Sequence, residues 1–182
     1  MGQEHWITPT YPGGVRFRWQ GVMDFGEFYR YLKWILQDHG LIDNDGFTPV
    51  FGGPKKTMET KFVERRMAGG LKNLEIEWKV FKKSGNYFKY NVWITILILG
   101  MKDEEVELNG VKRKLDRADY DIRMGANVET AADEEWEKMG VFKKIYYNFF
   151  VAKRLQVHKR DLYILFYRLN SDVKEYITKP RY

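Results

Sequence analysis

The side chains that most often carry out nucleophilic or acid–base chemistry are scarce in this sequence. It has no cysteine, and its three histidines are His5, His39 and His158. No second histidine or carboxylate stands at metal-ligand spacing from any of them. A nucleophilic triad would need Ser84 or Ser171 together with a histidine that is far away in the sequence. Each serine has a simpler interpretation, in a turn or a helix, so the sequence assigns no catalytic residue and no metal ligand.

Three aspartates, Asp116, Asp119 and Asp121, are close enough in sequence to converge. Paired carboxylates can bind a metal ion or exchange protons with a substrate. Arg117 and Arg123 lie among them and would neutralise their charge. We therefore favour a turn and a solvated strand edge for this segment.

Tyr87, Lys89 and Trp93 alternate along one predicted strand and would project from the same face of it. Such a face can stack unpaired bases while a lysine contacts phosphate. It can equally be buried beneath a helix, and burial is the interpretation that we favour.

A basic segment stands near the C-terminus. Residues 138–168 hold eight lysines and arginines and a single acid, Asp161. Such an element attracts phosphate, either in nucleic acid or in lipid headgroups. A solvated helix face that aids solubility has the same composition, so both interpretations stay open. This segment begins at Lys138 and ends at Arg168. Its candidate phosphate-binding residues are Lys143, Lys144, Lys153, Arg154, Lys159 and Arg160.

Hydrophobic periodicity predicts the elements that would position these groups. Alternation over residues 15–20 predicts a strand, and apolar spacing predicts a helix over residues 24–40. Asp24 and Glu27 form a predicted capping box at the start of that helix, and Gly40 ends it. A further strand is expected over residues 58–66.

The middle of the chain predicts antiparallel hairpins. Residues 74–80 and 88–98 alternate around the turn at residues 84–86. Asn109 and Gly110 form a strong two-residue hairpin signal between residues 104–108 and 111–115. Residues 120–124 predict one more strand.

The C-terminal part predicts a long helix over residues 131–177, with a bend or break near His158 because residues 156–161 are mostly polar. We expect a single domain over residues 1–182. We expect residues 1–14 to form an extended tail and residues 158–182 to form a helical extension.

Bulk composition limits the class of protein. The chain has 182 residues, of which 44% are hydrophobic, and its net charge is +6. Its first ten residues lack the basic start and apolar run of a secretory signal. Its longest apolar run, residues 92–99, is far shorter than the roughly 20 residues that span a bilayer. We therefore expect a cytoplasmic protein without a transmembrane segment.

The predicted order of elements is a strand, a helix, five or six antiparallel strands and a long C-terminal helix. Over residues 15–177 this order resembles the helix-grip fold of the START and polyketide-cyclase-like superfamily. The resemblance implies a bent sheet that wraps the last helix and leaves an apolar cavity between them. Its walls would be formed by Trp78, Tyr90, Val92, Ile94, Phe142, Ile145, Tyr146 and Phe149.

The sequence thus predicts an α+β fold, in which a curved antiparallel sheet of six to seven strands packs against a short N-terminal and a long C-terminal helix. The expected function is that of a non-enzymatic binding protein that holds a hydrophobic or amphipathic, lipid-like molecule between sheet and C-terminal helix, without a cofactor. Two alternatives stay open. One is an RNA-associated protein, or one that binds an anionic membrane surface, through residues 138–168. The other is a cyclase- or hydrolase-type enzyme that uses the same cavity.

Overall fold

An antiparallel sheet forms the centre of the computed structural model, which describes residues 3–9, 14–42, 47–48, 56–85, 87–108, 110–130 and 151–178. Its strand order is β1-β8-β7-β6-β5, and β2 also pairs with β8. The bounds are β1 Gln3–Trp6, β2 Val15–Met23, β5 Glu59–Arg66, β6 Lys72–Ser84, β7 Phe88–Leu108 and β8 Val111–Thr130. A separate ribbon pairs β3 (Phe47–Thr48) with β4 (Lys56–Thr57).

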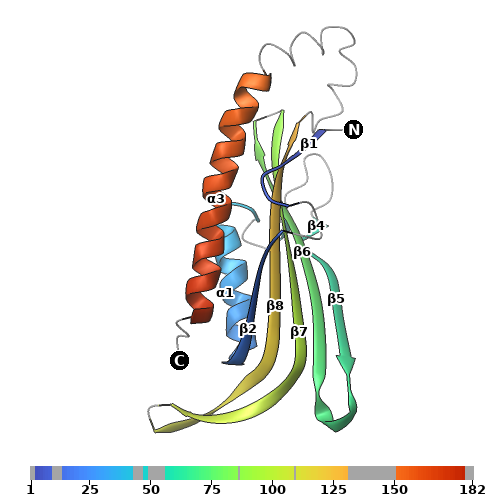
Figure 1. Ribbon diagram of the computed structural model, residues 1–182, viewed down its shortest axis with the longest axis vertical. Coiled ribbons are helices and arrows are strands. Elements are labelled where there is room, and N and C mark those ends of the chain that lie inside the picture. Colours follow the sequence, from blue (N-terminus) through green and yellow to red (C-terminus); the bar gives the residue numbers. More distant parts are fainter. Residues whose placement is uncertain are drawn as a thin grey trace.

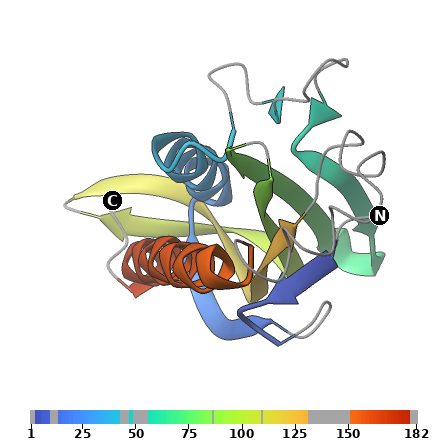
Figure 2. The same cartoon turned by 90° about the horizontal axis from the view of Figure 1, so that it is seen from above.

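Helices α1 (Phe25–Asp38) and α3 (Ala152–Thr178) lie on the same side of this sheet (Figure 1). The view from above shows the sheet curving around that side (Figure 2). A six-stranded curved antiparallel sheet with a short N-terminal and a long C-terminal helix confirms the predicted α+β fold class. Neither described helix is apolar enough over a sufficient length to cross a lipid bilayer.

The hairpin predicted at residues 109–110 is confirmed. Leu108 pairs with Val111, and Gly110 between them has a φ of 79°. A two-residue turn of this kind needs positive φ, which glycine adopts without a steric penalty.

Strands β7 and β8 are longer than the sequence pattern indicates, at 21 and 20 residues. We predicted separate strands over residues 88–98 and 104–108, and again over residues 111–115 and 120–124. The pairing instead continues through an irregularity between Leu99 and Lys102, where Gly100 has a φ of 64°. A β-bulge bends a ladder without ending it, so each predicted pair of strands is one strand.

Helix α1 begins as predicted. The Oδ1 atom of Asp24 accepts a hydrogen bond from the backbone N–H of Glu27 at 2.8 Å. The Glu27 carboxylate pairs with Arg30 at 2.6 Å, so the second half of the predicted capping box is replaced by an ion pair within the helix. Gly40, with a φ of 67°, ends the helix, and the N–H of Leu41 bonds the carbonyl of Leu36.

Helix α3 runs without a break through His158, so the predicted bend there is wrong. The reason is that His158 lies on the core side of the helix despite its polarity. Its ring stacks on Phe88 with 3.9 Å between centroids, and its Nδ1 atom lies 2.8 Å from the hydroxyl of Tyr90. The polar stretch therefore stays anchored to the sheet. The predicted start of the helix, over residues 131–150, lies outside the described residues.

Part of the segment that we predicted as an extended tail is attached to the sheet. Gln3–Trp6 is strand β1, which pairs with β8 over residues 127–130. Thr8 continues the attachment, because its Oγ1 atom accepts a hydrogen bond from the N–H of Ala126 at 3.1 Å. Short polar and aromatic strands of this kind lack the repeated alternation from which a strand is predicted.

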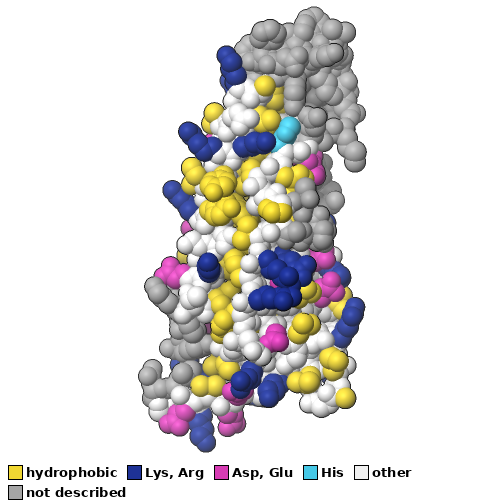
Figure 3. Space-filling model, in the orientation of Figure 1, with side chains coloured by type: hydrophobic (Ala, Val, Ile, Leu, Met, Phe, Trp, Pro, Cys, Tyr) yellow, Lys and Arg dark blue, Asp and Glu magenta, His cyan; other side chains and the backbone are white. Residues whose placement is uncertain are grey.

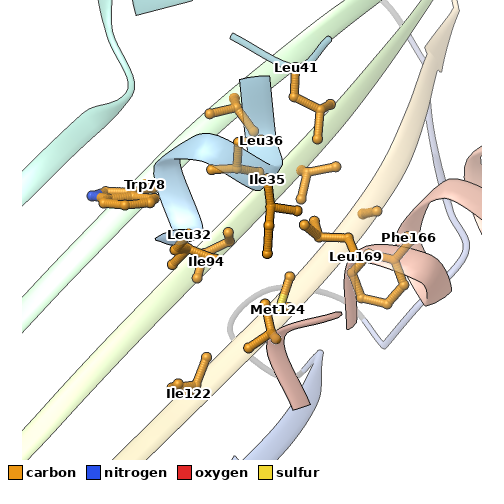
Figure 4. Close-up of a cluster of buried hydrophobic side chains, with 14 of the residues drawn as sticks. Leu32, Ile35, Leu36, Leu41, Trp78, Ile94, Ile122, Met124, Phe166 and Leu169 are labelled. Atoms are coloured by element: carbon orange, nitrogen blue, oxygen red, sulfur yellow. The ribbon is translucent and has the colours of Figure 1, made fainter. Parts of the chain in front are cut away.

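The hydrophobic core lies between the helices and the sheet. Leu32, Ile35 and Leu36 from α1 meet Phe166 and Leu169 from α3 over the strands that carry Ile94, Ile122 and Met124 (Figure 4). At most 2% of each of these side chains is exposed. The two helices also touch directly, since the rings of Phe28 and Tyr176 lie 5.5 Å apart.

Removal of the Phe166 ring should destabilise the protein strongly. We expect Phe166→Ala to lower the free energy of unfolding by about 3–5 kcal/mol, because a fully buried ring leaves a cavity. Urea denaturation followed by circular dichroism measures this change. Phe62→Ala on β5, where the ring is 52% exposed, is the matched control and should cost about 0.5 kcal/mol. Similar losses in the two variants would contradict this placement of α3.

Candidate ligand pocket on the outer face of the sheet

The sheet face that points away from the helices contains a hollow of about 520 Å³. We call it the outer-face pocket, and it is lined by residues of four neighbouring strands. The lining residues are Glu4 and Trp6 of β1, Lys79, Val80 and Phe81 of β6, Lys89, Asn91, Val92 and Trp93 of β7, and Asn127 and Glu129 of β8. Its volume lies within the range of about 300–1,000 Å³ that is usual for small-molecule sites.

Alternation along β7 places these groups opposite the core. Tyr90, Val92 and Ile94 belong to the buried cluster beneath the helices. Successive side chains of a strand point to opposite faces, so Lys89 and Trp93, on either side of them, face the pocket. The same rule applies to β8, where Asn127 and Glu129 alternate with the core residues.

Trp93 forms an aromatic wall of the pocket and is only 6% exposed. Its indole lies flat over β8 at Gly125, where an added Cβ atom would come within 2.3 Å of the ring. Gly14, which immediately precedes β2, approaches the same ring. A Cβ atom added to Gly14 would lie 2.6 Å from the indole. Two glycines thus provide the space in which this side chain can lie against the sheet.

A chain of polar groups runs across the pocket from β7 to β8. Lys89 pairs with Glu129 at 3.0 Å, and both side chains are about a quarter exposed. Asn91 donates to the Oδ1 atom of Asn127 at 2.9 Å and to Glu129 at 3.1 Å. Burial raises the pKa of Glu129, but the hydrogen bonds from Asn91 and Lys89 outweigh it and hold this pKa below its ordinary value. The carboxylate is therefore charged at neutral pH.

Lys89 also contacts an aromatic ring. Its Nζ atom lies 4.8 Å from the ring centroid of Phe81 on the neighbouring strand β6. A cation at this distance is attracted by the negative face of the ring. The lysine is thus held by one carboxylate and one ring, so a fixed positive charge stands beside apolar surface.

The four sheet residues that we predicted as cavity walls lie in the core. At most 1% of Trp78, Val92 and Ile94 is exposed, and 6% of Tyr90. Trp78 packs edge-on against Tyr29 of α1 at 4.8 Å, and its Nε1 atom lies 3.4 Å from a carboxylate oxygen of Glu59. The predicted helix walls Phe142, Ile145, Tyr146 and Phe149 lie outside the described residues. The predicted cavity between sheet and C-terminal helix therefore stays a prediction.

Some of the predicted phosphate-binding residues lie within the described part of the chain and others lie outside it. Lys153, Arg154 and Arg160 are exposed on α3, and Lys159 is half-buried. Lys143 and Lys144 lie outside the described residues.

Ser84 and His158, which are distant in sequence, meet beside the turn between β6 and β7. The Oγ atom of Ser84 lies 3.4 Å from Nδ1 of His158, but the same nitrogen is closer to the hydroxyl of Tyr90, at 2.8 Å. Within the described residues no carboxylate bonds the imidazole. This contact therefore anchors α3 to the hairpin and lacks the orienting third group of a nucleophilic site.

The turn and solvated strand edge that we favoured for the aspartates near residue 120 are wrong, because residues 111–130 form one strand that pairs with both β7 and β2. The predicted neutralisation by arginine is found at Asp121. Asp121 accepts hydrogen bonds from Arg16 at 2.8 Å and from Arg123 at 3.1 Å. The bond from Arg16 and the one from Arg123 together lower the pKa of Asp121 to about 2 despite its partial burial. Asp116 accepts instead from the backbone N–H of Phe25 at 3.1 Å. Among the described residues no cluster of ligands suited to a metal ion occurs.

Sequence reasoning identified only part of the pocket. It placed Lys89 and Trp93 on one strand face and favoured their burial under a helix. Trp93 is buried, but on the face away from the helices, and Tyr87 lies outside the strand against Phe88. Asn127 and Glu129 were missed because their approach to Asn91 and Lys89 depends on the β7–β8 register. Trp6 was missed because it lay in the predicted tail.

Comparisons with protein-family models, with curated protein sequences and with solved structures found no match for this chain. The resemblance to the helix-grip superfamily therefore stays a prediction from the order of the elements.

The fit of Trp93 against Gly125 predicts a steric effect. We expect Gly125→Ala to lower the free energy of unfolding by about 1–3 kcal/mol, because the new methyl group collides with the indole. Urea denaturation of Gly125→Ala, Trp93→Leu and the double variant measures the coupling. The alanine should cost much less when Trp93 is leucine. An equal cost in both backgrounds would show that the indole does not lie over Gly125.

The environment of His158 predicts a dependence of stability on pH. Burial lowers the pKa of His158, so the unfolded chain binds a proton at this residue more readily than the folded chain. Stability from this source is constant above the ordinary histidine pKa of about 6.5 and decreases as the pH falls below it. His5 contributes in the same direction, since burial lowers its pKa as well.

We expect His158→Gln to reduce the acid-dependent loss of stability between about pH 6.5 and 5. Urea denaturation at several pH values measures the slope in the wild type, in His158→Gln and in His5→Gln/His158→Gln. The slope should decrease in that order. An unchanged slope in the double variant would contradict this assignment.

Proposed function

We propose that this chain is a binding protein that holds an amphipathic small molecule in the outer-face pocket. The observation that carries this proposal is a hollow of about 520 Å³ in which two indole rings and a phenyl ring adjoin a hydrogen-bonded row of charged and amide groups. Small-molecule sites combine mainly apolar walls with a few polar groups that orient the guest. The same class of ligand was expected from the sequence.

The lining indicates which chemistry the ligand has. Trp6, Trp93 and Phe81 offer flat apolar surface, which suits a planar or ring-shaped apolar body. Lys89 and Glu129 offer opposite charges in the lining of the hollow, and the amide of Asn91 donates hydrogen bonds to Asn127 and Glu129. A molecule with one polar or charged end and one apolar ring satisfies both halves of this surface.

The proposed site differs from the one that the helix-grip resemblance implies. There the ligand would lie between sheet and C-terminal helix, where the described space holds Leu32, Ile35, Phe166 and Leu169. On the outer face the aromatic groups border open space. The proposal therefore keeps the type of ligand and assigns it to the opposite side of the sheet.

Binding of an amphipathic aromatic probe tests this proposal. We expect anilinonaphthalene sulfonate to bind the folded protein, and Trp6→Ala to weaken that binding about tenfold, because one wall of apolar contact is lost. Lys89→Gln should also weaken it, by removing the charge that faces the sulfonate. Fluorescence titration measures the dissociation constant.

Trp34→Ala is the matched control. Trp34 is 57% exposed on α1, away from the pocket, so its removal should leave the dissociation constant unchanged. Circular dichroism verifies that each variant is folded. Binding that is unaffected by Trp6→Ala and Lys89→Gln, or reduced equally by Trp34→Ala, would contradict the proposed site. Native mass spectrometry of freshly purified protein then identifies a natural ligand by its mass.

A further inference from the structure

Helix α3 has a second apolar surface that its packing on the sheet does not use. Its core side is formed by residues such as Leu162, Phe166 and Leu169, none of which is exposed. Its outward side nevertheless carries four large apolar side chains, each between 43% and 49% exposed. They are Val157, Tyr163, Ile164 and Tyr167.

These four side chains form a continuous stripe along the helix. Val157 and Ile164 are seven residues apart, which is close to two helical turns. Tyr163 and Tyr167 are four residues apart, and their rings lie 4.3 Å from each other. We call these four residues the outer stripe of α3.

Cations border the outer stripe. Lys153, Arg160 and Arg168 are seven and eight residues apart, again close to two helical turns, and all three are exposed. Arg160 is 4.0 Å from Asp161, while in the part of the chain that the structure describes Lys153 and Arg168 form no ion pair. Figure 3 shows hydrophobic side chains gathered over α3 with lysine and arginine side chains around them. An apolar stripe thus stands among positive charges that are free to meet an anionic partner.

We propose that the outer stripe of α3 docks on the surface of an anionic phospholipid membrane. The helix would lie parallel to the surface, with its apolar side chains at the boundary between headgroups and acyl chains. Lys153, Arg160 and Arg168 would contact lipid phosphate and carboxylate groups. This inference does not depend on the ligand proposed for the outer-face pocket.

The aliphatic members of the stripe favour a membrane over a nucleic acid. A nucleic-acid surface uses cations for phosphate and aromatic rings for bases, and it gains little from exposed valine and isoleucine. A membrane interface accommodates both, because aliphatic side chains enter the acyl region while tyrosines occupy the headgroup level. Val157 and Ile164 lie beside Arg160 and Arg168 on the outward side of the helix, which matches the membrane arrangement.

Co-flotation of the full chain with vesicles tests this proposal. We expect binding to vesicles of phosphatidylcholine mixed with phosphatidylserine, weaker binding at high salt, and little binding to phosphatidylcholine alone. The variant Lys153→Gln/Arg160→Gln/Arg168→Gln should reduce the partition coefficient by about fivefold for each cation removed. Val157→Ser/Ile164→Ser should reduce it by about tenfold or more, through lost apolar burial.

Matched controls come from exposed residues on other elements. Lys112→Gln/Arg113→Gln on β8 removes charge, and Phe62→Ser on β5 removes apolar surface, without changing α3. Both should bind vesicles like the wild type. Equal binding to the two kinds of vesicle, or equal losses in the control variants, would overturn the proposal. A chain that does not bind vesicles would also overturn it. In that case, a mobility shift of a short single-stranded RNA that only the charge variant abolishes would identify nucleic acid as the partner.

Discussion

The pairing of β7 with β8 is the constraint on which the rest of this structure depends. Its register begins at Leu108 and Val111 and reaches Phe88 and Thr130, so two strands of about 20 residues are aligned by one set of hydrogen bonds. Because side chains alternate across a sheet, this register decides at once what faces the helices and what faces away. A slip by one residue would put Lys89 and Asn91 into the core. The core and the pocket are therefore two sides of one alignment.

Local signals in the sequence were sufficient for those elements whose ends are marked by particular residues. Asp24 and Gly40 bound α1, and the β7–β8 hairpin predicted from Asn109 and Gly110 is confirmed by the pairing of Leu108 with Val111. These local signals gave wrong predictions where tertiary contacts determine the backbone structure. We predicted separate strands on either side of Gly100, yet the ladder continues past this residue. The polar residues 156–161 led us to predict a bend near His158, yet stacking on Phe88 holds this part of α3 against the sheet.

The candidate site was harder to predict than the fold, for a physical reason. A strand with apolar residues on one face and a mixture on the other gives no indication of which face has open space, because burial and cavity lining use the same residue types. Trp78 and Trp93 illustrate this. Trp78 fills the core against Tyr29, while Trp93 lies over a glycine on the other face and leaves a hollow beside it. Gly125 and Gly14 leave the space in which Trp93 lies, and their proximity to Trp93 is a long-range contact.

The two proposed surfaces lie on opposite sides of the molecule. Helix α3 buries Phe166 and Leu169 against the inner face of the sheet, so the outer stripe of α3 points away from the sheet on the helix side. The outer-face pocket opens on the reverse side, beyond β7 and β8. A chain resting on a surface through α3 would therefore keep its pocket open to solvent. Occupation of one surface leaves the other accessible, because the thickness of the core and the sheet separates them.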